Sequence, residues 1–446
     1  METVPERPWS DQAQNIVILS TLFLVIFIDA LAYSLYAPFF PSEAEDKGVS
    51  TTVVGLIFGT YPLGMFIFSL ACGFLITKFG AFFMLLSGCF VFGGSFIMFG
   101  FCGLISDTAM FTAFCFLLRA TLAIGGSASE VAALSILIGK FPNNVGAITG
   151  AGATSYGVGL SIGPALGGFL YSVGGFIVPF IVMGCAMIFT TPGVFLFLRR
   201  TEKQTDEKTA EESTTIFRAL RNPGTFTSVL SFVVSGCSFG YIEPIFEPYM
   251  KQLGESTVNI GLMFLLFSGM FTLSAPAVGV IVDKTKRYRG FLILGFTSSG
   301  IGYLLLGPAP FLTFLPQRNV LLVCISLALS GLARGLSFAP IMPDLIRKAR
   351  ERGMPNNSST NAVLSSIFGS MFYLGATIGP IIAGVTDEHL GFQWSTSIAG
   401  FICFGHALLL LICTVYQDLP FSDWVKENNS GLPEEEEKPM LGNSRS

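Results

Sequence analysis

Twelve apolar segments follow one another along this chain, and they constrain its fold more than any other feature. Each has about the 20 residues that a helix needs to cross the hydrocarbon core of a bilayer. The segments are 16–40, 53–77, 82–105, 109–141, 147–171, 176–198, 225–250, 258–282, 290–313, 319–346, 360–385 and 393–416. Charged residues make up only 12% of the chain, about half of their share in a soluble domain. Because lipid offers no hydrogen bonds to the backbone, we expect an all-α membrane protein with twelve transmembrane helices.

The basic residues predict how these spans are oriented. If residues 1–15 lie in the cytosol and the spans alternate, the inner loops hold sixteen basic residues. The outer loops then hold three, Lys47, Lys251 and Arg318. Cytosolic loops are enriched in Lys and Arg, so both termini are expected in the cytosol. The acidic segment 417–446 is expected to be a solvated cytosolic tail.

Repeated sequence patterns divide the chain into two halves. A charged linker, residues 199–224, separates the first six spans, residues 16–198, from the last six, residues 225–416. Two patterns occur once in each half: Gly73-x-x-x-Thr77-Lys78 with Gly279-x-x-x-Asp283-Lys284, and Gly163-Pro164-x-x-Gly167-Gly168 with Gly379-Pro380-x-x-Ala383-Gly384. The repeats predict a duplicated six-helix unit, whose halves surround a central cavity that opens to alternate sides of the membrane.

The fifth span is dense in glycine and carries no charge. Gly159, Gly163 and Gly167 lie four residues apart and form a flat stripe on one helix face, beside which Pro164 forms a hinge. Small residues of this kind let two helices approach closely in a membrane. The stripe is interpreted in two ways, as a general helix-packing surface or as part of the seam between the two halves.

These patterns resemble those of a known transporter superfamily. The Gly163 to Gly168 string resembles the fifth-helix antiporter motif of the major facilitator superfamily, and the segment from Gly73 to Ala81 resembles its second-to-third-helix signature, without two of the usual charges. In the second half Asp283 is retained beside Lys284, so the cytosolic gate is expected to depend more on that side.

Longer stretches resemble the vesicular amine transporter family, in particular its polyamine-transporter-like branch. They are APFFPSEAEDKG, KFPNNV, GPALGGFLY, VPFIVMGC, GSMFYLGATIGP and GFQWS, and they extend from the first span to the last. The resemblance implies the major facilitator fold and proton-driven loading of acidic vesicles with cationic amines, either polyamines or monoamines.

Seven ionisable residues lie inside the apolar segments, and each is a candidate for function. They are Asp29, Arg119, Glu130, Glu243, Glu247, Arg334 and Asp344. A charge in the bilayer centre costs at least about 2.5 kcal/mol on insertion scales, so such residues are rare without a role. Five acids against two arginines predict a cavity that attracts cations. Burial also favours the neutral form of a carboxylate, which suits these groups to carry protons.

The expected substrate contacts are Asp29, Tyr33, Glu243 and Glu247. Asp29 matches the first-helix aspartate of the monoamine and acetylcholine carriers, although a structural ion pair with Arg119 is the alternative. Glu243 lies in IEPIFEPYM, which resembles a seventh-helix stretch of the monoamine carriers. Glu247 follows four residues later on what is expected to be the same helix face. Tyr33 is one of several aromatic residues that offer a ring face to a cation.

The expected proton-coupling residues are Arg119, Glu130 and Asp344. Arg119 begins RATLAIG, which resembles a fourth-helix motif of the superfamily, and its permanent charge suits it to tune a neighbouring carboxylate. Glu130 follows eleven residues later on the same helix face, and Asp344 occupies nearly the same place in the second half. The alternative for both acids is a solvated position at the cytosolic rim.

No enzyme or cofactor motif occurs in the sequence. It contains no G-x-S-x-G, Walker loop, H-E-x-x-H or paired C-x-x-C pattern, so we expect neither catalysis nor a metal, and we expect an ion gradient as the energy source. The expected partners are the bilayer, protons and a small organic cation, without nucleic acid, for a protein that acts as a monomer. Two alternatives to a vesicular antiporter remain open: a plasma-membrane exporter of drugs or organic cations, and a non-transporting sensor.

Overall fold

The computed structural model describes residues 11–141, 145–198, 223–351 and 358–418, and this part of the chain consists of helices joined by turns and loops, without a β-strand. The helices of the first half are α1 (Asp11–Ser34), α2 (Phe40–Asp46), α3 (Thr51–Phe79), α4 (Ala81–Phe101), α5 (Thr108–Lys140), α6 (Val145–Gly174) and α7 (Ile177–Leu198), with a 3-10 turn, η1, at Cys102–Leu104. Those of the second half are α9 (Pro223–Gly240), α10 (Phe246–Gln252), α11 (Thr257–Thr285), α12 (Tyr288–Leu306), α13 (Val320–Phe338), α14 (Ile341–Glu351), α15 (Ser358–Leu390) and α16 (Phe392–Asp418).

Eleven of the described helical segments are long and apolar enough to cross a membrane. The remaining predicted span, 225–250, is divided between α9 and α10, and its apolar part is the shorter helix Gly224–Gly240. Large apolar side chains such as Phe189 and Leu273 are 78% and 74% exposed on the outside of the bundle. Exposure of this kind is typical of a surface that faces lipid, so the chain is a multi-pass membrane protein.

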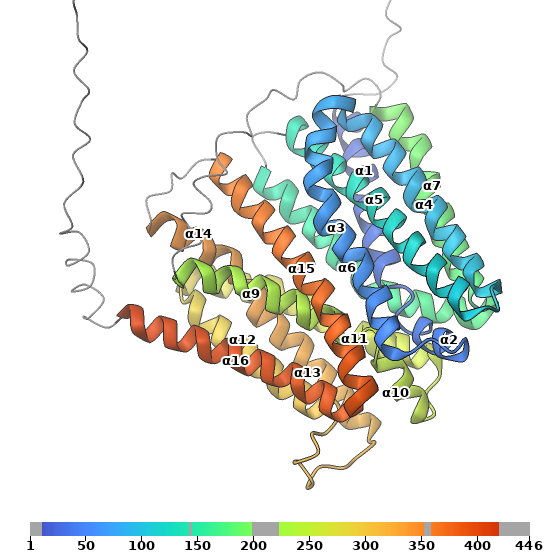
Figure 1. Cartoon of the computed structure of the whole chain (residues 1–446). Helices are drawn as coiled ribbons and strands as arrows, with labels where there is room; N and C mark the ends of the chain where they lie inside the picture. The colour runs from blue at the N-terminus through green and yellow to red at the C-terminus, as the bar shows by residue number, and fades with distance from the viewer. Residues whose placement is uncertain (1–10, 142–144, 199–222, 352–357, 419–446) are drawn as a thin grey trace, which may run out of the picture.

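Figure 1 shows the two halves as two helix bundles that meet at one end and spread apart toward the other. We call the end of the bundle that carries Lys78, Lys140 and Lys284 the inner end, because the charge distribution predicts that it faces the cytosol. The opposite end, which carries α2 and α10, is the outer end. The linker 199–224 lies almost entirely outside the described residues.

The first helix of each half is broken at the same place, and a proline explains each break. α1 ends at Ser34, four residues before Pro38, and α9 ends at Gly240, four residues before Pro244. A proline has no N–H to bond the carbonyl four residues earlier, and its ring clashes with that carbonyl. The chain therefore passes through a short turn, at 35–39 and 241–245, before α2 and α10 begin. These turns lie where the two halves meet.

The glycine stripe of the fifth span packs inside the first half. A Cβ atom at Gly159 would lie 2.5 Å from the carbonyl oxygen of Phe27 in α1, and added carbons at Gly163 and Gly167 would collide with Ser34 and Leu35. Of the two interpretations, the helix-packing surface therefore describes these three glycines, and the seam between the halves does not. The stripe allows α6 to lie directly against α1.

The seam between the halves is made by the other residues of the same motif. A Cβ atom at Gly168 would lie 2.7 Å from the carbonyl oxygen of Thr257, at the start of α11, and one at Gly261 would lie 2.6 Å from the carbonyl oxygen of Pro164. The motif thus presents its first glycine to its own half, and the carbonyl of its proline and its last glycine to the other half.

The second half repeats this arrangement on α15. Gly379 faces the carbonyl of Cys237 in α9, whereas Gly384 packs on Thr51 at the start of α3. Gly55, in the first turns of α3, lies against the carbonyl of Pro380. The two contacts, α6 with α11 and α15 with α3, close the outer end.

The predicted cytosolic gate residues are separated in this conformation. Gly73 and Lys78 lie in the last two turns of α3, and Asp283 lies in the last turn of α11. The side chains of Lys78 and Asp283 are exposed, and Asp283 makes no ion pair within the described residues. The closed outer end and the free Asp283 describe a state that is open toward the inner end.

Candidate functional site

Asp29 lies five residues before the end of α1 and is only 2% exposed. Its Oδ1 atom accepts a hydrogen bond from the hydroxyl of Tyr61 in α3, at 3.1 Å between the two oxygens. α5 closes this site at Gly126, where a Cβ atom would lie 2.6 Å from the Tyr61 hydroxyl and 3.3 Å from Asp29 Oδ1. Glycine at this position therefore leaves just enough space for the carboxylate and the hydroxyl.

Glu243 lies in the turn that separates α9 from α10 and is 5% exposed. Its Oε2 atom accepts a hydrogen bond from the hydroxyl of Tyr33, at 3.4 Å. The carboxylate lines a small cavity to which both halves contribute, with Pro164 and Leu160 from α6 and Phe264 from α11. Glu243 is therefore placed between the halves, as expected of a cavity residue.

Tyrosine and phenylalanine rings connect the two carboxylates. The ring centroids of Tyr33 and Tyr61 are 5.5 Å apart, and Tyr33 also lies 6.4 Å from Phe239 of α9. Because Tyr61 bonds Asp29 and Tyr33 bonds Glu243, one continuous aromatic path runs from the first acid to the second. Ring faces attract cations by about 0.5 to 2 kcal/mol each, so the path suits an ammonium group.

Glu130 is half-buried on α5 and contacts the second half. It accepts a hydrogen bond from the hydroxyl of Tyr373 in α15, at 2.9 Å. Its negative charge also acts on Asp29, which places the two acids in one electrostatic neighbourhood. Asp29, Glu130 and Glu243 make no ion pair within the described part of the chain.

Arg119 is buried on α5 but does not bond Asp29. Its Nη2 atom donates to the hydroxyl of Tyr36 and to the carbonyl of Phe58, the latter at 3.3 Å. Pro62 explains why this carbonyl is available, because it lies four residues later in α3 and has no N–H to donate. The guanidinium group also lies 4.6 Å and 5.1 Å from the ring centres of Tyr36 and Tyr61. The alternative of an Asp29–Arg119 ion pair therefore does not describe this structure.

Glu247 lies away from Glu243, and the expectation that both share one helix face is wrong. The break at Pro244 places Glu247 in the first turn of α10. Both of its carboxylate oxygens contact Ser42 of α2, Oε2 through the backbone N–H at 2.9 Å and Oε1 through the hydroxyl at 2.6 Å. Lys251 adds an ion pair at 3.0 Å. In this conformation Glu247 joins the two halves at the outer end.

Asp344 is completely buried near the inner end of the second half. Its carboxylate lies 2.9 Å from Nη2 of Arg347 and 3.6 Å from Nε of Arg289, and it accepts a 2.6 Å hydrogen bond from Ser228 of α9. Asp344 thus joins α14, α12 and α9. This paired environment differs from the unpaired surroundings of Glu130, its expected counterpart.

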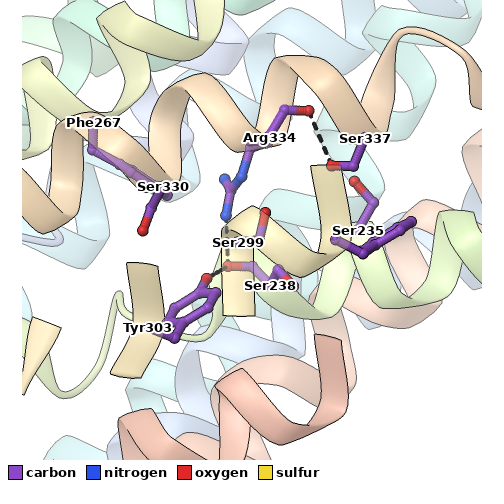
Figure 2. A pocket seen from close by; sticks show the side chains of 9 residues that line it. Ser235, Ser238, Phe267, Ser299, Tyr303, Ser330, Arg334 and Ser337 are labelled. Atoms are coloured by element: carbon purple, nitrogen blue, oxygen red, sulfur yellow. Dashed lines mark hydrogen bonds between the residues drawn. The ribbon is translucent and has the colours of Figure 1, made fainter. Parts of the chain in front are cut away.

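Arg334 and His406 are also buried in the second half. Arg334, on α13, donates from Nη2 to the carbonyl of Ser238 at 2.6 Å (Figure 2). Its guanidinium group also lies over the rings of Phe239 and Phe267, at 4.7 Å and 4.4 Å from the ring centres. Its positive charge and that of Arg119 both act on Glu243. His406 lies within 2.8 Å of the Ser231 hydroxyl, which fits a packing residue with a hydrogen bond.

Two important residues, Tyr61 and Ser42, were not identified from the sequence. Tyr61 directly precedes Pro62 in the middle of a span, and this proline was the available signal. Ser42 lies in a segment rich in charged residues, and no local pattern distinguishes it. Within the described residues, no group of three or more His, Cys, Asp or Glu side chains is arranged to hold a metal ion.

Comparisons with known proteins identify relatives over most of the chain. The family model of the Major Facilitator Superfamily matches residues 22–364. The MFS-type transporter SLC18B1 of Rattus norvegicus is 34% identical over 417 residues, which cover 93% of this chain and 89% of the relative. The synaptic vesicular amine transporter of Homo sapiens is 24% identical over 365 residues, or 81% of this chain and 66% of the relative.

Solved structures share the fold at low sequence identity. The crystal structure of a D-xylose-proton symporter superimposes with a TM-score of 0.69 at 14% identity, over 90% of this chain and 97% of that one. A POT family transporter in complex with a thioalcohol-conjugated peptide gives a TM-score of 0.68 at 13% identity, over 90% and 96%. These similarities concern the arrangement of the helices alone.

Proposed function

The chain belongs to the Major Facilitator Superfamily, and on this premise we propose that it is a secondary active antiporter that exchanges protons for a cationic amine. It is a transporter related to SLC18B1 and to the vesicular amine transporters, and it is not an enzyme. The name of the synaptic vesicular amine transporter supports an amine substrate.

One observation carries the proposal: Asp29 and Glu243, the latter at the junction of the halves, are buried without a basic partner at ion-pair distance. Each accepts a hydrogen bond from one tyrosine hydroxyl. An ionised carboxylate in such a place is costly unless a cation or a proton neutralises it. An ammonium group and a proton then compete for the same carboxylate, and this competition is the physical basis of exchange.

Glu243 is proposed as the main contact for the ammonium group. It lies in the break of α9, lines the cavity between the halves and contacts Tyr33 of the other half. Broken helices near the middle of the membrane form substrate sites in many transporters. Asp29 is proposed as a second contact at the other end of the aromatic path.

The separation of the two acids favours a polyamine. Two tyrosine side chains, Tyr61 and Tyr33, lie between the Asp29 and Glu243 carboxylates. A monoamine has one ammonium group and contacts one acid at a time, whereas a polyamine carries several charges along a chain. An extended polycation is therefore the ligand that would satisfy both carboxylates at once.

Proton transfer toward the inner end is assigned to Glu130, with Arg119 as a tuning residue. Glu130 is half-buried, bonds Tyr373 across the interface and acts on Asp29, so protonation of one acid affects the other. Asp344 is proposed to contribute through its ion pairs, because protonation of its carboxylate would release Arg289 and Arg347 at the inner end.

Transport is proposed to proceed by rocking of the two halves. In the inner-open state, the Glu247–Ser42 contact and the glycine contacts at Gly168 and Gly384 hold the outer end closed. In the opposite state, Asp283 and Lys78 would close the inner end. A vesicle membrane is the proposed location, with acidic contents as the source of protons.

The test uses the purified full-length protein in proteoliposomes with an acidic interior. We expect uptake of labelled spermidine that stops when ionophores collapse both the pH gradient and the membrane potential. Undiminished uphill uptake after collapse would exclude exchange against protons. Specific binding without any uptake would support the sensor, and a tagged protein at the cell surface would support the plasma-membrane exporter.

A further inference from the structure

A second polar pocket is lined only by residues of the second half, and it shares Phe267 with the cavity that contains Glu243. Nine residues of α9, α11, α12 and α13 line it: Ser235, Ser238, Phe267, Phe296, Ser299, Tyr303, Ser330, Arg334 and Ser337 (Figure 2). All of them are buried except Ser238, which is half-buried. The space is about large enough for one water molecule or one monatomic ion.

Two hydrogen-bonding groups of this pocket have no partner. Arg334 uses Nη2 to bond the Ser238 carbonyl, but its Nη1 atom is buried and unbonded. The hydroxyl of Ser330, one turn earlier on α13, is also buried and unbonded. Buried polar groups without a partner are uncommon in native proteins, and each one calls for an explanation.

The chemistry of the lining selects an anion. Arg334 carries a permanent positive charge and has no ion-pair partner within the described residues, and no carboxylate lines the pocket. The guanidinium N–H groups and the serine hydroxyls are hydrogen-bond donors, and they can form charge-assisted hydrogen bonds to a bound anion. The positive charge of Arg334 would repel a cation, and no carboxylate in the lining could bind one.

We propose that this pocket binds a single small monovalent anion, with chloride as the physiological ion, between Arg334 and Ser330. Such an anion would neutralise the buried guanidinium and satisfy both unbonded donors. Larger anions such as gluconate or sulfate do not fit a space of this size. The binding claim follows from the pocket alone and does not depend on the proposed transport function.

The pocket adjoins the element that holds Glu243. Arg334 and Tyr303 both donate to the Ser238 carbonyl, which lies one turn before Tyr241–Ile245, the turn that contains Glu243. An anion at Arg334 would fix the side chain that supports the end of α9, and it would screen one of the two positive charges that act on Glu243. This regulatory consequence does rest on the proposed function, with chloride altering amine affinity.

The decisive measurement is binding of radiolabelled chloride to the purified full-length protein in chloride-free detergent buffer. We expect saturable binding that bromide displaces and gluconate does not. Ser330→Ala should weaken binding about 10-fold or more, because it removes one donor to a charged guest. Arg334→Gln should abolish it.

Matched controls separate anion binding from damage to the fold. Ser326→Ala removes another buried hydroxyl of α13, one that already bonds the Gly302 carbonyl at 2.7 Å and lies outside the pocket lining, so chloride affinity should not change. If Arg334→Gln does not fold, Ser330→Ala decides, since its hydroxyl makes no bond in the structure. No saturable chloride binding, or equal affinity in wild type and Ser330→Ala, would overturn the proposal and leave a pocket that holds only water.

Discussion

Tyr33, in the last turn of α1, donates a hydrogen bond to Glu243 in the break of the seventh span, and the bond joins the two halves of the molecule. The two oxygens are 3.4 Å apart, and the residues are 210 positions apart in the sequence. Each residue lies within a few positions of a proline-induced helix end. Rotation of one half against the other must therefore change this contact.

Glu243→Gln should lower the affinity for a cationic amine. The substitution keeps size and hydrogen bonding but removes the charge, and loss of a charged contact costs on the order of 2 kcal/mol, or about 30-fold in affinity. Equilibrium binding of labelled spermidine to the purified protein measures the effect. Glu255→Gln, at the outer end, is the matched control and should bind normally. Unchanged affinity with loss of pH dependence would instead identify Glu243 as the proton carrier and Asp29 as the amine site.

Asp29→Asn should weaken binding of a polyamine more than binding of a monoamine. Only an extended ligand can contact both ends of the aromatic path from Asp29 to Glu243, so only that ligand loses an ionic contact when Glu243 remains intact. The ratio of spermidine affinity to monoamine affinity is the measured quantity, and we expect it to fall about 10-fold. A similar loss for both ligands would mean that Asp29 does not form a second subsite.

Gly163→Leu and Gly168→Leu should fail in different ways. The first places a side chain against Ser34 of α1 within one half, so we expect lower thermal stability and lower yield. The second places a side chain against Thr257 of the other half, so the protein should fold but be unable to close its outer end.

Labelling of single cysteines placed at the outer end distinguishes these two results. Gly168→Leu should increase labelling there and abolish transport while retaining the melting temperature of the wild type. A normal transport rate for Gly168→Leu would contradict the assignment of this glycine to the seam.

Much of the fold was predictable, because it depends on patterns that are local in sequence. The lengths of the apolar segments predicted the spans, and the repeated motifs predicted two similar halves. The motif at Gly163 was recognised, but the helices that its glycines contact were not predicted. Spacing alone does not say which helix lies opposite each glycine. The breaks of the first and seventh spans were also missed. Pro38 and Pro244 stood at the necessary positions, and the steric effect of proline on the carbonyl four residues earlier accounts for both.

The sequence identified candidate residues for the site but not the contacts that these residues make. A charge in an apolar segment is visible in the sequence, and so Asp29, Arg119 and Glu243 were named. Their partners depend on contacts between distant helices, as the Tyr61–Asp29 and Tyr33–Glu243 bonds illustrate. Glu247 was misplaced for the same reason, because one break in the helix turned its side chain toward Ser42.

Glu247→Gln should make the outer end open more readily. The Glu247 carboxylate bonds both the backbone and the hydroxyl of Ser42 and pairs with Lys251 while the halves are closed there. Loss of the charge removes about 1.5 to 3 kcal/mol of interaction in the closed state. Ser42→Ala should have a smaller effect in the same direction, and the two changes together should be less than additive. Cysteine accessibility at the outer end reports the result, and strictly additive effects would refute a direct contact.

Arg119 and Pro62 should be coupled energetically through the carbonyl of Phe58. Pro62 leaves the Phe58 carbonyl without a helical donor, and Arg119 supplies one at 3.3 Å. Arg119→Met removes that donor and leaves the Phe58 carbonyl without a hydrogen bond. The loss of this bond should lower the free energy of unfolding by about 1 to 3 kcal/mol. Pro62→Ala restores an N–H at the position that normally bonds residue 58, so Arg119→Met should cost less in that background. A double-mutant cycle on thermal unfolding of the purified protein measures the coupling, with Pro192→Ala in α7 as the control background. Equal costs of Arg119→Met in the wild-type and Pro62→Ala proteins would mean that the Phe58 carbonyl contributes nothing and that Arg119 is held by Tyr36, the Ile57 carbonyl and its ring contacts.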